Sequence, residues 1–275
     1  MMGSFALVTG LHWGAVLLYS VATFLAATGA VFRKPGADRW ARRLVLVAIA
    51  VHGAGLLVWW RIVGHGPYID RFEVLSAYAW VLAVCFAIAA RLEPRIQPAA
   101  VVVYPATFVL IAIGLFLQPA IRQLPPTFRG IWLVLHILFY KIAFASVVIA
   151  FVFSVFYLLK RRNRLRRFTS LPDLPVIDLY AYRFAGFGFV FWAIGMVAGS
   201  VWAYQSWNIF WNWDPVQTWS LIAWVMFGIY LHLRRFFGWQ GERAAWLFAA
   251  CFAGVLVSLF LTPVIESSIH AEYFK

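Results

Sequence analysis

Charged residues are scarce in this sequence. Only 12% of the 275 residues are Asp, Glu, Lys or Arg, whereas soluble domains carry roughly 25%. Hydrophobic residues make up 64% of the chain, which leaves too little polar surface to cover a water-soluble globule. The scarcity of charge excludes an ordinary soluble enzyme and a disordered chain, and it predicts a protein that crosses a membrane several times.

Cysteine is also rare. The two cysteines, Cys85 and Cys251, each lie inside an apolar run, and no Cys-x-x-Cys occurs. This excludes a small disulfide scaffold and argues against a thiol-redox site or a c-type haem attached to this chain. The first apolar run has no basic residues before it and no cleavage-like site after it, so we interpret it as a retained span rather than a signal peptide.

Uncharged runs divide the chain into segments that are long enough to cross a bilayer. A spanning helix needs about 17–25 apolar residues, and continuous rather than alternating apolar runs disfavour strands. The sequence therefore predicts an all-α polytopic membrane protein with about eight transmembrane helices, in a single integral membrane domain over residues 1–275. The expected helices cover residues 11–32, 44–61, 74–90, 99–118, 131–159, 184–204, 215–234 and 244–265.

Basic residues outnumber acidic ones by 23 to 10. In a soluble protein this excess would suggest nucleic acid, but here the basic residues lie between apolar runs, and we expect a membrane-lipid environment and no nucleic-acid partner. Seventeen of the 23 lie in alternate loops on one side, five lie on the other side, and Lys141 lies within a span. The positive-inside rule predicts that the richer side is cytoplasmic. Both termini are then on the outer, periplasmic side of a bacterial inner (cytoplasmic) membrane.

One outer segment, residues 202–219, is crowded with tryptophan. Its members are Trp202, Trp207, Trp211, Trp213 and Trp219. An aromatic belt explains scattered tryptophans at helix ends, but not this density. Asp214-Pro215 predicts a helix start, with Asp as N-cap and Pro at the first helical position. The segment would suit a large flat aromatic ligand such as a porphyrin, because Trp combines apolar π-faces with an N–H donor.

Two of the six histidines lie at the height of this segment. His136 opens the fifth expected helix at its outer end, and His270 lies in the outer C-terminal tail. Two neutral imidazoles approaching from opposite sides could ligate one haem iron axially. The alternative for each histidine taken alone is an interfacial polar group.

The other histidines have different surroundings. His232 lies near the inner end of the seventh expected helix, and His52 lies inside the second, where ionisable groups are costly and usually functional. We interpret His65 as a turn residue and His12 as interfacial. A histidine–carboxylate proton relay is the competing use, and it is weakened because no carboxylate lies deep in a span.

These residues carry a family resemblance. The segment Trp211-Asn-Trp213-Asp214-Pro215-x-x-Thr218-Trp219, continued by Ile229-Tyr230-Leu231-His232-x-Arg234, resembles the tryptophan-rich motif of the CcsA cytochrome c assembly proteins. CcsA belongs to a haem-handling superfamily with CcmC and CcmF. The resemblance continues through Gly238-Trp239-Gln240-Gly241, and upstream Gly64-His65-Gly66-Pro67 and Phe72-Glu73 resemble a degraded outer-loop motif.

The resemblance implies a protein that binds haem b and presents it outside the membrane to apocytochrome c. His136 and His270 match the family's two outer haem ligands, and His232 matches its intramembrane histidine. A ResB/CcsB-type partner supplies a further membrane histidine in the family, and His52 is our candidate for that role if no partner does so. The tryptophans and Asp214 would hold and orient the ring. The resemblance also implies haem lyase (holocytochrome c synthase) activity shared with the partner. It identifies no catalytic residue here and leaves open whether this chain is itself an enzyme.

One departure supports an alternative function. The family usually has Lys-Glu where this chain has Val216 and Gln217. A CcsA-like haem b subunit that oxidises quinol and feeds a multihaem cytochrome is therefore the alternative to a biogenesis factor, and a non-haem scaffold or transporter is a third. A visible spectrum separates the third from the others, and complementation of a cytochrome-c-deficient strain separates the first two.

Overall fold

The chain is all-helical in the part that the structure describes. The computed structural model describes residues 2–261 apart from 118, 123, 125, 167 and 169. Over these residues there is no strand, and eight helices are long and apolar enough to cross a membrane. The prediction of an all-α membrane protein with about eight spanning helices is confirmed.

The chain divides into two compact units. The described residues of 1–123 and 165–172 form the first unit, and those of 124–164 and 173–275 form the second. Each unit contains four of the eight spanning helices. The expectation of a single integral membrane domain over 1–275 stays a prediction.

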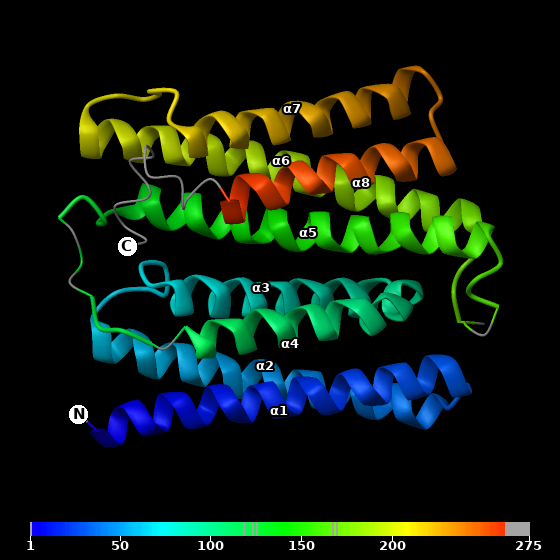
Figure 1. Ribbon diagram of the computed structural model, residues 1–275, viewed down its shortest axis with the longest axis horizontal. Helices are drawn as coiled ribbons and strands as arrows, with labels where there is room; N and C mark the ends of the chain where they lie inside the picture. Colours follow the sequence, from blue (N-terminus) through cyan, green and yellow to red (C-terminus); the bar gives the residue numbers. More distant parts are fainter. Residues whose placement is uncertain are drawn as a thin grey trace. The chain divides into compact units, whose positions relative to one another are not determined.

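The first unit is a closed arrangement of four helices, drawn from blue to green in Figure 1. They are α1 (Met2–Phe32), α2 (Pro35–Val63), α3 (Arg71–Leu92) and α4 (Ala100–Phe116), with a short 3-10 helix at Pro94–Ala99 before α4. Helices α1 and α3 each pack against both α2 and α4, which closes the ring of contacts.

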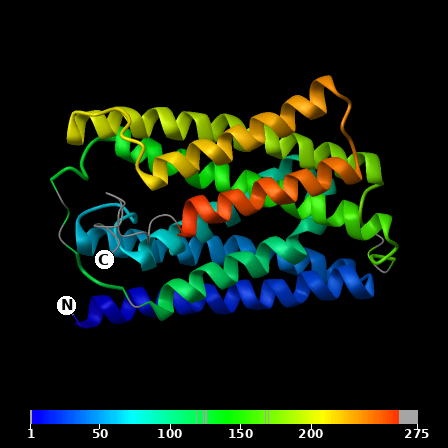
Figure 2. The ribbon, with the colours of Figure 1, turned by 45° about the horizontal axis from the view of Figure 1, so that its top comes forward.

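The second unit repeats this pattern with four more helices (Figure 2). They are α5 (Ile131–Arg161), α6 (Leu174–Trp207), α7 (Pro215–Phe236) and α8 (Glu242–Leu256), followed by a π-helical segment at Val257–Leu261. Helix α5 packs against α6 and α8, and α7 packs against the same two. Small residues allow the close α5–α6 contact, because a Cβ added at Gly188 or Gly195 would lie 2.6 or 2.7 Å from a side-chain atom of α5.

Several helices begin earlier than the sequence predicted. Helix α2 begins at Pro35 rather than residue 44, and α6 begins at Leu174 rather than residue 184. Charged residues mark where the hydrocarbon ends, but a helix can continue into the headgroup region, where its charged side chains are solvated. The connection before α6 is therefore shorter than expected. At the other end of the chain, α8 ends at Leu256, and residues 262–265 of the expected span lie outside the described residues.

An ion pair inside the second unit explains how α6 accommodates a charge in its early turns. Arg234 Nη1 and Nη2 donate to the two carboxylate oxygens of Asp178 at 2.6 and 2.8 Å. The backbone N–H of Gly241 donates to the same carboxylate at 3.0 Å. The pair therefore ties α6 to α7 and to the turn before α8, in the bidentate geometry that Arg and carboxylates favour.

Candidate functional site

The His136 imidazole is held in a defined tautomer near the start of α5. Its Nδ1 lies 2.9 Å from the carbonyl oxygen of Gly195 on α6. Because a carbonyl can only accept, Nδ1 carries the proton of the neutral ring and Nε2 carries the lone pair. Metal-binding histidines commonly show this arrangement, in which one ring nitrogen donates to a carbonyl and the other faces the metal.

Packing fixes the orientation of the His136 ring as well as its tautomer. The ring stacks on Trp202 with centroids 6.2 Å apart and meets Tyr140 edge to face at 4.9 Å. The ring also lies against Gly199, where an added Cβ would overlap Nδ1. Gly199 therefore has to remain glycine if His136 is to keep this position.

A buried polar cluster lies one turn further along α5. The hydroxyl groups of Tyr140 and Ser220 form a hydrogen bond, and Trp192 Nε1 donates to Ser220 Oγ at 3.0 Å. These residues come from α5, α6 and α7, so the cluster fixes the helix that carries His136 against the next two helices of the chain.

Trp202 supports the site from inside the unit. It is 3% exposed, its Nε1 donates to the carbonyl of Thr127 at 2.8 Å, and its ring meets Trp207 edge to face at 4.9 Å. The sequence predicted Trp202 as part of a ligand platform. In the structure its indole is a buried support beneath His136, and the half-buried Trp207 packs on it.

The remaining tryptophans of the segment are more accessible. Trp213 is 69% exposed and Trp219 is 37% exposed. Trp211 is half-buried, and its Nε1 is buried with no hydrogen-bond partner among the described residues. Trp211 and Trp213 meet at 85°, with centroids 5.9 Å apart, so they form an L-shaped edge rather than one flat shelf.

Asp214 is the N-cap of α7, as the sequence predicted. Its carboxylate accepts from the backbone N–H of Val216 at 2.9 Å, and Pro215 occupies the first helical position. The loop before it is held by the first turn of α7, since Gln217 Oε1 accepts from the backbone N–H of Asn212 at 3.0 Å. The family usually has Glu at position 217, and a Glu carboxylate oxygen could accept the same hydrogen bond from Asn212 that the Gln217 amide oxygen accepts here.

Two replacements of Asp214 should distinguish the contribution of its N-cap hydrogen bond to stability from that of its negative charge. Asp214→Ala removes the acceptor at the start of α7 and should lower stability by about 1 kcal/mol, while Asp214→Asn keeps an acceptor and should cost only a few tenths. Thermal unfolding of both variants in the same detergent checks this. Equal losses of stability in the two variants would mean that the negative charge of Asp214, and not its N-cap hydrogen bond, stabilises the fold.

His232 belongs to a different depth of the second unit. It lies in the last turns of α7, is exposed, and packs on Phe236 with centroids 4.7 Å apart. Its Cα is about 20 Å from that of Trp219 along the helix, at roughly 1.5 Å per residue. His232 therefore cannot share one iron with His136, whose helix end lies beside the tryptophan segment. The other predicted outer ligand, His270, lies outside the described residues.

The first unit contains a histidine pair that the sequence did not reveal. His12 and His52 are both fully buried, and the Nε2 atoms of both lie within hydrogen-bond distance of Ser76 Oγ, at 3.1 and 2.8 Å. His12 is therefore not interfacial. No sequence pattern linked the three residues, because they come from α1, α2 and α3.

The hydrogen bonds fix the proton positions of this pair. His12 Nδ1 donates to the Val8 carbonyl at 2.8 Å, so His12 Nε2 must accept from the Ser76 hydroxyl. Since Ser76 has only one proton, His52 Nε2 must donate to it. The lone pair of neutral His52 is then on Nδ1, which is buried without a partner among the described residues. Ligation of a metal through the more usual Nε2 would require His52 to release Ser76.

Ser76→Ala tests this assignment. The change leaves one donor and one acceptor nitrogen buried without a partner, which should lower stability by about 1–3 kcal/mol. Ser20→Ala is the matched control, because the Ser20 hydroxyl donates to the Val16 carbonyl of its own helix and not to a side chain of another described helix. Thermal unfolding of both variants is the measurement, and a control loss as large as that of Ser76→Ala would contradict the shared hydrogen bonds.

A buried carboxylate organises the loop between α2 and α3. Glu73 is 1% exposed and accepts from Trp59 Nε1 at 2.7 Å and from the backbone N–H of Ile69 at 2.8 Å. It also forms a capping box with Asp70 at the start of α3. Burial, reinforced by the Glu73 charge, raises the pKa of the Tyr68 phenol in this loop, so Tyr68 stays protonated. The Phe72-Glu73 part of the outer-loop motif is thus a structural element of the first unit.

His65 lies beside this carboxylate, buried in the turn that the sequence predicted. Its Nδ1 donates to the Gly66 carbonyl at 2.8 Å, and its Nε2 has no hydrogen-bond partner among the described residues. Across the described part of the chain, no three His, Cys, Asp or Glu side chains are placed to hold a metal ion together. An iron that brings its own porphyrin nitrogens needs only one or two such ligands.

Comparison with known proteins supports the resemblance. The model of a family described as Cytochrome C assembly protein matches residues 68–270. The Cytochrome c biogenesis protein CcsA of Chlamydomonas reinhardtii is 29% identical over 231 residues, covering 80% of this chain and 64% of that protein. The protein of the same name from Prochlorococcus marinus (strain MIT 9312) is 30% identical over 272 residues, covering 88% of this chain and 87% of that protein.

A solved structure has a similar fold. The chain of a Cytochrome c Heme Lyase CcmF matches 98% of this chain with a TM-score of 0.73 and 17% sequence identity, and this chain spans 48% of it. The fold likeness agrees with the all-helical architecture of this chain. The chain belongs to the cytochrome c assembly protein family.

Proposed function

We propose that this protein acts in cytochrome c maturation by binding haem b at the tryptophan-bearing end of the second unit and presenting it to apocytochrome c. The observation that carries the proposal is His136, whose Nδ1 is occupied by the Gly195 carbonyl while Nε2 keeps the lone pair. The family match supports a role in cytochrome c assembly.

The residues at this end of the unit fit a porphyrin. His136 would ligate the iron through Nε2, and His270 would be the second protein ligand. Exposed indole surface at Trp213 and Trp219 would cover part of the apolar ring. The partnerless N–H of Trp211 is a donor of the kind that a propionate can accept from. Haem, when bound, supplies the vinyl groups to which cysteine thiols of the apocytochrome add to form thioethers.

The chain's own residues then position and shield the group. Trp202 and Gly199 keep the His136 ring at one angle, and the Tyr140–Ser220 hydrogen bond holds its helix in place. Asp214 fixes the first turn of α7, and this also fixes the C-terminal end of the loop that carries Trp211 and Trp213. Such positioning is the protein's main contribution when a cofactor carries the chemistry.

We further propose that His232 holds haem at a second, membrane-embedded position. Its exposed ring is accessible to a ligand or to a partner's side chain. His52 would be an additional intramembrane ligand only after it releases Ser76. A ResB/CcsB-type protein is the proposed membrane partner, and the proposed location is the bacterial inner membrane, with the tryptophan segment facing the periplasm.

A spectrum of the purified protein tests the haem assignment. The protein should carry b-type haem that acid–acetone extraction removes, and His232→Ala should lower the haem content per chain by about half if there are two sites. A colourless preparation that still supports full cytochrome c maturation would contradict the proposal. Haem binding without any effect on maturation would favour the electron-transfer alternative instead.

A further inference from the structure

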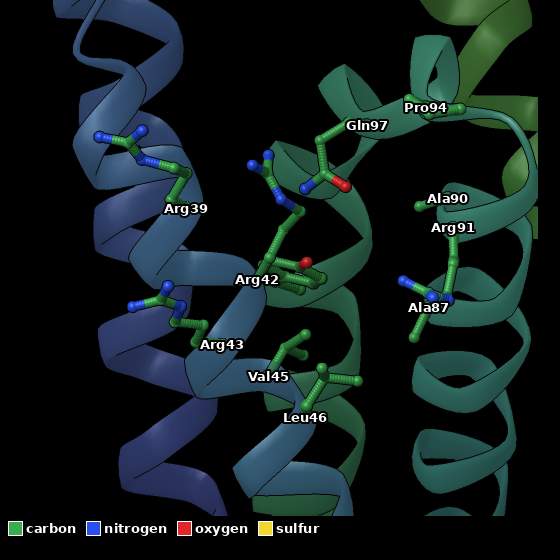
Figure 3. A pocket seen from close by; sticks show the side chains of 11 residues that line it. Arg39, Arg42, Arg43, Val45, Leu46, Ala87, Ala90, Arg91, Pro94 and Gln97 are labelled. Atoms are coloured by element: carbon green, nitrogen blue, oxygen red, sulfur yellow. The ribbon is translucent and has the colours of Figure 1, made fainter.

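Four arginines line one pocket at an end of the first unit. Arg39, Arg42 and Arg43 come from α2, and Arg91 comes from the facing end of α3 (Figure 3). The pocket has a volume of about 570 Å³, and Gln97 of the short 3-10 helix adds a polar side chain to its lining. The arginines are all exposed, so an anion can reach them without rearrangement of the helices.

Most of the positive charge of this pocket is not balanced by the protein, although Arg42 interacts electrostatically with Asp38 one turn before it on α2. Within the described residues, none of the four arginines has a carboxylate oxygen within ion-pair distance. Asp38 is the nearest acid along α2, but it does not line the pocket, and its carboxylate lies against Gly29 of α1. By contrast, the Arg234 guanidinium contacts Asp178 at 2.6 Å.

The walls of the pocket become apolar toward the middle of the helices. On α2 the arginines are followed by Val45 and Leu46, and on α3 Arg91 is preceded by Ala87 and Ala90. Figure 3 shows Val45 and Leu46 below Arg42 on α2, and Ala87 below Arg91 on α3. The pocket therefore presents cations at the helix ends and hydrocarbon deeper in, which matches a molecule with an anionic head and an apolar body.

We propose that this pocket binds the headgroup of an anionic phospholipid, with phosphate oxygens between Arg42 and Arg91 and acyl chain along Leu46 and Ala87. Basic pockets between transmembrane helices bind lipids with phosphate-rich heads, such as cardiolipin. A pocket of this size takes a glycerophosphate head and the first part of the chains, but not a whole lipid. Four arginines suit a head with two phosphates. The site is independent of the proposed haem function.

Titration of the purified full-length protein with tetraoleoyl cardiolipin or dioleoyl phosphatidylcholine, followed by native mass spectrometry, tests the proposal. The wild type should bind cardiolipin selectively. Arg42→Gln/Arg91→Gln should weaken cardiolipin binding about 30-fold, since each basic residue near the surface contributes a factor of about 5. The matched control is Arg33→Gln/Lys34→Gln, which removes the same charge at neighbouring positions that do not line the pocket, and it should change binding by less than about 3-fold.

Two further measurements distinguish a built pocket from a generally basic surface. Ala90→Leu keeps every arginine but fills part of the space, and it should weaken cardiolipin binding by about 5-fold through steric overlap. Inorganic phosphate at about 5 mM should not displace the lipid, because a free phosphate lacks the apolar contacts. Any one of four results would overturn the proposal. They are equal losses of cardiolipin binding in the two double variants, equal binding of the two lipids by the wild type, no effect of Ala90→Leu, and displacement of the lipid by phosphate.

Discussion

Replacing His136 with Ala is expected to abolish cytochrome c maturation while the protein remains inserted in the membrane. The imidazole is the only histidine ring at this end of the described second unit whose tautomer leaves Nε2 as the acceptor, so its loss removes the proposed iron ligand. Haem-stained yield of a c-type cytochrome should fall by about 100-fold, the upper range for disturbed metal sites. Immunoblots of washed membranes measure whether the variant is still inserted.

Two further variants test whether the effect is specific to the His136 imidazole. Gln205→Ala changes an exposed polar side chain of α6 near the same end and should leave maturation unchanged. In His136→Gly, added imidazole should restore part of the haem spectrum, because a free ring can occupy the vacated space beside Gly199. Wild-type maturation in His136→Ala would show that this residue is not an axial ligand.

Gly199→Ala is expected to reduce haem affinity by about 10-fold without unfolding the second unit. The added methyl would overlap His136 Nδ1, so the ring must rotate away and lose its bond to the Gly195 carbonyl. Titration of the haem-free protein with haem, followed by absorbance, measures the affinity.

Gly186→Ala is the matched control for this substitution. Gly186 lies on the same helix, and a Cβ there would meet no atom within 4 Å. It should leave haem affinity unchanged and raise helix stability slightly, since Ala is the better helix former. If both variants lose haem to the same extent, the effect comes from α6 in general and not from the orientation of His136.

The helix pattern could be predicted from the sequence because one signal dominates it. Uncharged runs between Arg and Glu residues locate all eight spanning helices, and Asp214-Pro215 locates the start of α7 to the residue. The early starts of α2 and α6 could not be predicted, since hydropathy reports where hydrocarbon ends and not where helical hydrogen bonding ends. The bidentate pairing of Asp178 with Arg234, which links α6 to α7, leaves no local pattern in the sequence.

The candidate site was predictable in composition but not in detail. Residue types and density pointed to His136 and the tryptophan segment. The sequence could not distinguish Trp202, a buried support, from Trp213, an exposed surface residue, because both are single tryptophans near a helix end. The pairing of His12 with His52 through Ser76 depends on how three helices pack, and helix packing order is not encoded in hydropathy.

The most direct test of the central claim is a cryo-electron microscopy map of the purified protein reconstituted with haem. The account predicts iron density bonded to His136 Nε2 on one face of the ring and to His270 on the other, with the ring edge beside Trp211 and Trp213. A map in which these two imidazoles are too far apart to share an iron, and in which the indoles are bare or covered by lipid, would contradict it.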